Sequence, residues 1–275
     1  MAESTSDTMS RRTGVFWGKK YYVIITGASA GIGREIAVAF SKQAAECSVF
    51  VITGRNSERL TETKRLVCDV APGVQVILKT MDHSKATFED YRKLISETSA
   101  KISGADGVVL VHNAATLGDV KKYAIAYTDE KEIDDYFHLN VTSVMTLTSA
   151  FLEKFSSSST IPRFIVNITS LAAIKPFVGT GLYCTGKAAR EMYLNVIAVE
   201  DPSLTVLHYS PGPVDTAMHH ELRRGVKEAA ATAYGARDSG MLLTPEATVL
   251  RLVQVLGAQE FKSGDHVDYF DRKPC

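Results

Sequence analysis

The sequence predicts an α/β fold with a doubly wound, seven-stranded parallel sheet and helices on both faces. Seven runs of strand length alternate with helical segments. A glycine-rich turn follows the first run, and 275 residues with 45% hydrophobic content can build one sizeable core. We expect a single domain over residues 19–275 after a flexible leader over 1–18, which lacks the apolar stretch of a secretory signal.

The first strand, residues 21–26, leads into a glycine loop and then a helical pattern over 34–44. Glycines permit close backbone approach, and the N–H groups at a helix start attract a pyrophosphate. Such a loop alone could be a simple turn, but between a strand and a helix it predicts nucleotide binding. The loop residues expected to contact the nucleotide are Gly27, Ser29, Ala30, Gly31, Ile32 and Gly33.

The second strand, residues 48–53, ends where NAD-binding folds usually place an acid for the ribose hydroxyls. Here the chain reads Gly54-Arg55-Asn56. No carboxylate would repel a 2′-phosphate, and the Arg55 guanidinium could bind it, so the sequence favours NADPH with Arg55 and Asn56 as contacts. Arg55 could instead be an ordinary solvated arginine.

The third and fourth strands, residues 74–80 and 107–111, end in polar or small residues. Carboxyl ends of parallel strands form the ligand crevice. We therefore expect Asp82 and His83 beside the adenine, and Asn113 and Ala114 along the adjoining part of the cofactor. A structural role is favoured over metal binding for His83 and His112, because no cluster with zinc spacing accompanies them.

The fifth strand, residues 163–168, is followed by Ser170, and a helix over 182–200 carries Tyr183 and Lys187. Residues four apart share a helix face, so the ammonium could favour the phenolate of Tyr183, whose free pKa is ~10. The Ser170 hydroxyl could hydrogen-bond a substrate carbonyl. The alternatives are a surface Tyr-Lys pair and a serine that only terminates the strand.

The sixth strand, residues 204–209, runs into the Pro211-Gly212 turn. Together with the glycine loop, Asn113-Ala114, Asn140, Ser170 and Tyr183-x-x-x-Lys187, this turn resembles the short-chain dehydrogenase/reductase family from residue 21 to the C-terminus. The resemblance implies a Rossmann-type domain that moves hydride between a nicotinamide and a carbonyl or alcohol. It makes Tyr183 the acid, Lys187 the ribose ligand that lowers the phenol pKa, Ser170 the carbonyl anchor and Asn140 a support of the proton relay. The remaining cofactor contacts that it implies are Pro211, Gly212, Val214, Thr216 and Met218.

Within that family the segment 261–268 resembles reductases of pterin side-chain ketones. There an aspartate near the chain end holds the amino-pyrimidine edge of the pterin, and Asp268 matches it. A carboxylate can accept two N–H bonds from such an edge, although Asp268 could also be a solvated acid like Asp265 and Asp271. The resemblance implies that Ser170, Leu171, Tyr183 and Gly212 complete the substrate site. Ala30 departs from the family, which often has an arginine there.

The 31 basic and 31 acidic side chains balance, so nothing suggests a nucleic acid or an anionic membrane as partner. Four scattered cysteines indicate reduced thiols and a cytoplasmic location. The resemblance implies a homodimer that pairs the helices 133–155 and 182–200. Residues 217–241, with breaks expected at Gly225, Gly235 and Gly240, could form a lid or a plain surface excursion. A reductase of other small ketones or dicarbonyls and a non-catalytic nucleotide-binding scaffold are the alternative functions.

Overall fold

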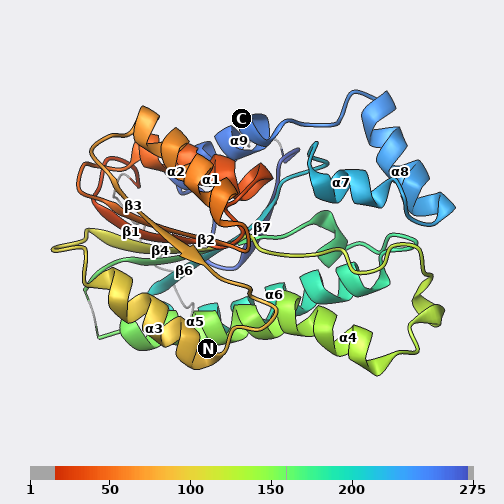
Figure 1. Ribbon diagram of the computed structural model, residues 1–275, viewed down its shortest axis with the longest axis horizontal. Coiled ribbons are helices and arrows are strands. Elements are labelled where there is room, and N and C mark those ends of the chain that lie inside the picture. The colour runs from red at the N-terminus through yellow and green to blue at the C-terminus, as the bar shows by residue number, and fades with distance from the viewer. Residues whose placement is uncertain (1–15, 159, 272–275) are drawn as a thin grey trace, which may run out of the picture.

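The computed structural model describes residues 16–158 and 160–271. Within these residues, one sheet of seven parallel strands lies between two helical layers, in the order β3-β2-β1-β4-β5-β6-β7 (Figure 1). The strands are β1 (Tyr21–Ile25), β2 (Val49–Gly54), β3 (Gln75–Thr80), β4 (Gly107–His112), β5 (Arg163–Ile168), β6 (Leu204–Ser210) and β7 (Asp265–Asp268). The predicted fold class is confirmed, and each strand named above from the sequence lies within about one residue of its predicted bounds.

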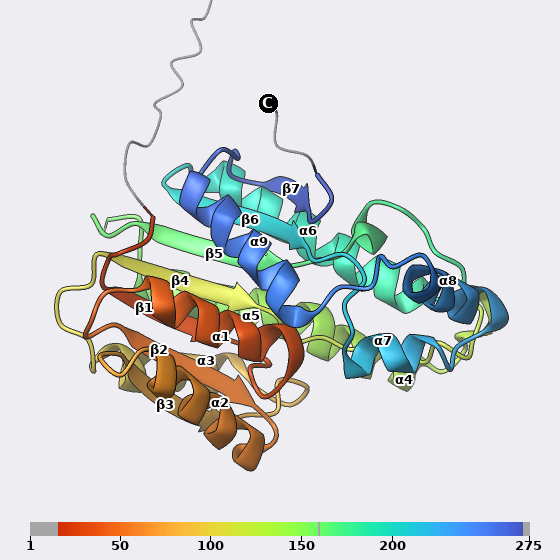
Figure 2. The same cartoon turned by 90° about the horizontal axis from the view of Figure 1, so that it is seen from above.

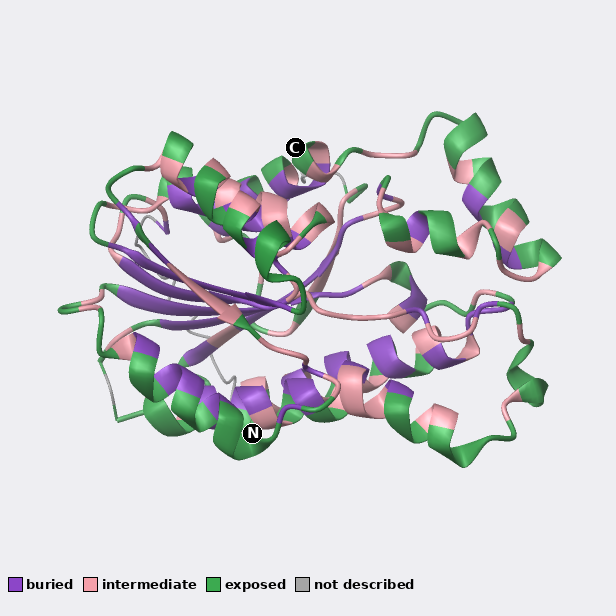
Figure 3. Cartoon of the chain, viewed as in Figure 1, coloured by how far each residue is buried: buried purple, intermediate pink, exposed green. Residues whose placement is uncertain are grey.

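Two helical layers cover the sheet. One face carries α1 (Gly31–Gln43), α2 (Ser57–Val70) and α9 (Pro245–Ala258), and the other carries α3 (Phe88–Ser99), α5 (Ser143–Lys154) and α6 (Gly181–Glu200) (Figure 1). Crossovers between parallel strands place helices on both faces, which is why β1, β2, β4 and β5 are buried at every residue. Figure 3 shows these strands buried between helices with exposed outer surfaces.

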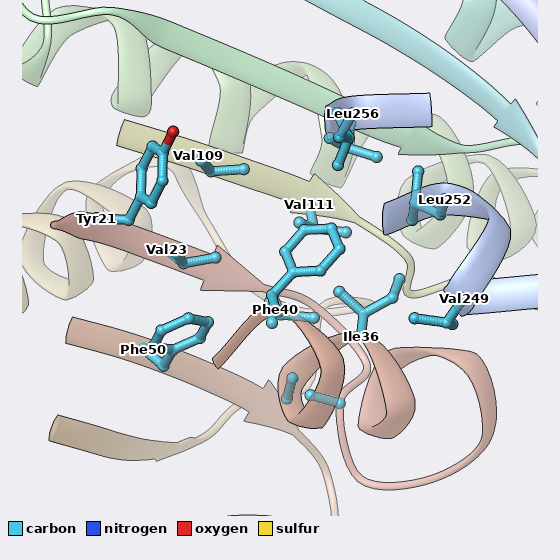
Figure 4. Close-up of a cluster of buried hydrophobic side chains, with 14 of the residues drawn as sticks. Tyr21, Val23, Ile36, Phe40, Phe50, Val109, Val111, Val249, Leu252 and Leu256 are labelled. Carbon is cyan, nitrogen blue, oxygen red and sulfur yellow. The ribbon is translucent and has the colours of Figure 1, made fainter. Parts of the chain in front are cut away.

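The core on the α1 side joins α1, α2 and α9 to the sheet. Ile36 and Phe40 of α1 point toward Val249 and Leu252 of α9, above the β1 and β4 side chains (Figure 4). The four helix side chains are each at most 1% exposed, and full burial of one such side chain stabilises the fold by about 1.5–3 kcal/mol. This core fixes α1, and therefore the glycine loop at its start.

The N-terminal boundary differs from the expected one. Residues 1–15 lie outside the described part of the chain, whereas Phe16 and Trp17, which we expected in the leader, pack in the core. Phe16 is 1% exposed and contacts the rings of Tyr21 and Phe164, and the Trp17 indole donates to Val253 O.

The segment 217–241 folds into α7 (Ala217–Leu222) and α8 (Lys227–Asp238). Figure 2 shows both helices beyond the arrowheads of the strands, at the carboxyl end of the sheet. As expected, Gly225 lies between the two helices and Gly240 follows α8. The break expected at Gly235 is wrong, because this residue lies inside α8, where a Cβ would meet open space.

Candidate active site

A cavity of about 940 Å³ lies at the carboxyl ends of the strands. Its wall runs from the glycine loop and Arg55, past Ser170 and Tyr183, to Asp268, with α7 and α8 on one side. Most of the predicted site residues line it. They are Gly27, Ser29, Ala30, Gly31, Ile32, Gly33, Arg55, Asp82, His83, Asn113, Ala114, Ser170, Leu171, Tyr183, Lys187, Pro211, Gly212, Val214, Thr216, Met218 and Asp268.

The glycine loop is held open as a backbone cradle. Gly27 and Gly31 have φ of +67° and +55°, and a Cβ on Gly33 would lie 2.4 Å from both Asn113 Nδ2 and Gly27 O. The Asn113 amide donates to Thr26 O (2.9 Å) and Gly27 O (3.1 Å), which fixes the loop against β4. This side-chain-free turn at the start of α1 fits the pyrophosphate of a dinucleotide.

The residues after β2 and β3 divide into cavity-lining and structural ones. Arg55 is exposed at the cavity wall, and hydrogen bonds from Ser84, assisted by the charge of Arg55, keep the pKa of Asp82 below its ordinary value. Asn56 is not among the residues that line the cavity, and its Oδ1 instead accepts from Arg59 N (2.8 Å) and caps α2.

His83 lines the cavity, but both of its ring nitrogens are hydrogen-bonded to other side chains of the protein. It is 5% exposed, and its two ring nitrogens hydrogen-bond with the Thr53 hydroxyl (2.8 Å) and the Tyr91 hydroxyl (2.9 Å). Both nitrogens are therefore occupied, as for a structural histidine. Within the described ranges, no group of three or more His, Cys, Asp or Glu side chains could hold a metal ion.

Tyr183, Lys187 and Ser170 meet at the centre of the cavity. Lys187 Nζ lies 5.5 Å from the centroid of the Tyr183 ring and donates to Ile168 O (2.7 Å) at the end of β5. Ser170 follows that strand, and its hydroxyl hydrogen-bonds with the Tyr183 hydroxyl. Gly186, between Tyr183 and Lys187, allows Tyr136 to pack closely against α6, because a Cβ there would lie 2.6 Å from the Tyr136 hydroxyl oxygen.

The expected lowering of the phenol pKa by Lys187 is not found. Burial raises the pKa of Tyr183, and the hydrogen bond with Ser170 and the charge of Arg190 oppose this rise. Burial and the neighbouring Arg190 also lower the pKa of Lys187 well below its ordinary value. Arg190 is a nearby cation whose charge acts to lower the pKa of Tyr183.

Arg190 is a site residue that sequence reasoning missed. It is 1% exposed, and its guanidinium donates to Asn167 Oδ1 (3.1 Å), Ala114 O (3.2 Å) and His112 O (2.9 Å). These bonds join α6 to the ends of β4 and β5. The sequence feature that could have indicated Arg190 is its spacing, because it lies one helical turn beyond Lys187 on the same helix.

Asn140 lies in a π-helical turn, His138–Thr142, where we expected one continuous helix over 133–155. α4 (Glu130–Phe137) precedes the turn and α5 follows it. Asn140 is 2% exposed, donates to Tyr136 O (3.0 Å) and accepts from Thr116 N (3.0 Å). It supports the loop after β4 and is not among the cavity-lining residues. Such π-helical turns are frequent at functional sites.

Asp268 closes the far end of the cavity at the last residue of β7. Its carboxylate accepts from the Ser210 hydroxyl (2.5 Å) and from Phe270 N (2.9 Å). A carboxylate has about four acceptor positions, so two remain for a ligand. The substrate end also includes apolar residues that sequence reasoning missed, among them Leu117, Phe177, Ala233, Met241 and Phe270. Several of them come from the 217–241 segment, for which no local motif existed.

The parallel sheet, the glycine cradle and the Ser170–Tyr183–Lys187 group define an oxidoreductase site for a nicotinamide cofactor. The chain belongs to the short-chain dehydrogenase family, whose model matches residues 21–227.

Curated relatives and solved structures agree with this assignment. The chain is 36% identical to sepiapterin reductase of Rattus norvegicus and 35% identical to that of Bos taurus, each match covering 90% of this chain and 95% or 94% of the relative. A short chain dehydrogenase of Salmonella enterica serovar Typhi superposes with a TM-score of 0.76 at 26% identity, covering 94% of this chain and 98% of that one. One of Shigella flexneri, complexed with NADP, superposes with a TM-score of 0.74 at 25% identity, covering 92% and 98%.

Proposed function

We propose that this enzyme reduces the side-chain ketone of a pterin with NADPH, converting sepiapterin to dihydrobiopterin or pyruvoyl-tetrahydropterin to tetrahydrobiopterin. The observation that carries the proposal is that Asp268 lines the same cavity as Ser170 and Tyr183. A carboxylate with two free acceptor positions suits the N–H edge of an amino-pyrimidine. The similarity to sepiapterin reductases over 90% of the chain supports this choice.

The reaction divides between the cofactor and the chain. When bound, the nicotinamide supplies the hydride. Tyr183 donates the proton to the ketone oxygen, while the Ser170 hydroxyl hydrogen-bonds that oxygen and stabilises the developing alkoxide. The raised pKa of Tyr183 keeps its proton in place at neutral pH, so the phenol is ready as a donor. Lys187 would hold the nicotinamide ribose, and Asn140 would support the proton relay through the loop that it fixes.

The cofactor preference rests on Arg55. The cradle Gly27–Gly33 would hold the pyrophosphate, Asp82 would lie beside the adenine, and the turn from Pro211 to Thr216 would hold the nicotinamide. The exposed guanidinium of Arg55 borders the cavity immediately after β2, where the adenosine ribose is expected. It could bind a 2′-phosphate, which favours NADPH.

The direct test mixes the purified protein with sepiapterin and either NADPH or NADH and follows loss of the yellow pterin absorbance. We expect loss of colour that depends on NADPH and is much slower with NADH. No loss with either cofactor would refute the pterin assignment, and equal rates would refute the role of Arg55.

Reduction of an apolar dicarbonyl is a second candidate function. The chain is 28% identical to a Bacillus cereus benzil reductase ((S)-benzoin forming), over 89% of this chain and 97% of that one. The apolar side chains of Leu117, Phe177 and Val178 in the cavity could receive aromatic rings. Benzil with NADPH is therefore the comparison substrate, and faster turnover of benzil than of sepiapterin would favour this candidate.

We also propose a cytoplasmic homodimer built on α5 and α6, with neither nucleic acid nor membrane as partner. Met192, Val196 and Val199 form an exposed apolar row on α6, being 65%, 46% and 81% exposed. Burial of such a row against a second copy would remove it from water. In the described part of the chain, Cys47, Cys68 and Cys184 are free thiols and no helix is long and apolar enough to cross a membrane. Sedimentation analysis of Val196→Glu tests the dimer, which this substitution should dissociate.

A further inference from the structure

We propose that the buried pair Glu191–His266 positions Asp268 relative to Ser170 and Tyr183, and so sets the affinity for a substrate held by Asp268. The inference rests on the proposed function, because it assigns this positioning role at the same substrate site. Glu191 and His266 touch neither the substrate nor the reacting atoms in this account, so they are positioning residues.

Glu191 joins the three segments that build the substrate end. It lies on α6, two turns after Tyr183, and its Oε1 accepts from the Thr169 hydroxyl and from His266 Nδ1 (2.9 Å). Thr169 immediately precedes Ser170, and His266 stands two residues before Asp268. One carboxylate oxygen therefore connects the strand end with Ser170, the helix with Tyr183 and the strand with Asp268.

The strand β7 needs such an anchor. It has four residues, occupies the end of the sheet order and, among the residues that the structure describes, pairs only with β6. Residues two apart in a strand point to the same face, so His266 and Asp268 share one face, while Val267 packs against the core on the other. The bond from His266 to α6 therefore fixes the face that presents the Asp268 carboxylate.

Because Glu191 is buried, loss of this contact would be costly. The side chains of Glu191 and His266 are 9% and 16% exposed, and a buried carboxylate is costly unless it is paired. The hydrogen bond with Glu191 raises the pKa of His266, and the bonds from His266 and Thr169 outweigh burial and lower the pKa of Glu191. Both shifts are in the direction that strengthens the hydrogen bond between the His266 ring and the Glu191 carboxylate.

The test compares two amide variants at one position. An asparagine amide can reach the place of His266 Nδ1 and keep the bond to Glu191, whereas a glutamine amide extends to the place of Nε2 and loses it. We expect His266→Gln to raise the KM for sepiapterin about tenfold with little change in kcat, and His266→Asn to stay near wild type. The KM for butane-2,3-dione, which is too small to need Asp268, should change in neither variant. If His266→Gln does not fold, His266→Leu replaces it, and Asp265→Asn on the same strand is the matched control.

A double-mutant cycle with Asp268→Ala distinguishes failure of the proposed positioning role from failure of the proposed function. If His266 acts through Asp268, His266→Gln should add nothing to the KM for sepiapterin in the Asp268→Ala background. The inference is overturned if His266→Gln has the same effect in both backgrounds, leaves the KM unchanged, or impairs both substrates equally. If Asp268→Ala itself leaves the KM for sepiapterin unchanged, the proposed function fails and the inference fails with it.

Discussion

Lowering the pH from 7 to 5 should destabilise this fold, because several imidazoles are buried in it without charge. His83 is 5% exposed between two hydroxyl groups, and His208 is fully buried between two asparagine side chains. Burial lowers the pKa of each from 6.5 to about 4. The folded state therefore resists protonation where the unfolded chain accepts it.

These pKa values give the direction and the magnitude of the change in unfolding free energy with pH. The neutral form is favoured in the folded state, so the contribution to stability is complete above pH 6.5 and is lost as the pH falls toward about 4. Over the whole window each histidine accounts for about 3 kcal/mol, and by pH 5 the two together account for about 4 kcal/mol. His112, also buried, has a lowered pKa and adds to the loss, while the raised pKa of His266 opposes it. The total is a large part of a typical unfolding free energy of 5–15 kcal/mol.

Urea denaturation at pH 7, 6 and 5 measures this effect, because the carboxylates remain largely ionised in that range. The free energy of unfolding should fall by several kcal/mol, and His208→Asn should reduce the decrease by about 2 kcal/mol. His220→Asn, at a side chain that is 58% exposed, is the matched control and should leave the decrease unchanged. A free energy that stays constant from pH 7 to 5, or a decrease that His208→Asn does not alter, would refute the reasoning.

Two further predictions concern the reaction. Tyr183→Phe should lower kcat by roughly 10²–10⁴-fold with the Kd for NADPH nearly unchanged, because only the proton donor is lost; wild-type turnover, measured by absorbance, would contradict the mechanism. Arg55→Ala should raise the KM for NADPH roughly tenfold and leave that for NADH unchanged, because only a 2′-phosphate contact is removed. Steady-state kinetics with both cofactors check this, and an equal change in the two KM values would exclude a phosphate-specific role.

The strands and the glycine loop were predictable because their signals are local. A strand that is buried on both faces often reads as a near-continuous apolar run, and the predicted strand 21–26 begins at the same residue as β1 and ends one residue later. The loop requires backbone conformations and close approaches that glycine alone satisfies, and these are visible as Gly27, Gly31 and Gly33. Asn56 also carried a local signal that we interpreted differently, because an asparagine immediately before a helix is a common cap.

The rest of the site depends on contacts between distant segments. The sequence shows Tyr183 and Lys187 one turn apart, but the burial that raises one pKa and lowers the other comes from the packing around α6. The π-helical turn at Asn140 is stabilised by Thr116, which lies 24 residues earlier. Glu191 and His266 are 75 residues apart and form no local pattern. Such pairings become visible only when the chain has folded.

The central claim is that Asp268 selects a pterin at a carbonyl-reducing site. The most direct measurement is the binding affinity of sepiapterin for the wild-type enzyme and for Asp268→Ala, with NADP+ present, by calorimetry. We predict a loss of about 2–5 kcal/mol, as expected when one partner of a buried charged hydrogen-bond pair is removed. An unchanged affinity would contradict the claim and leave the apolar dicarbonyls as the better substrate class.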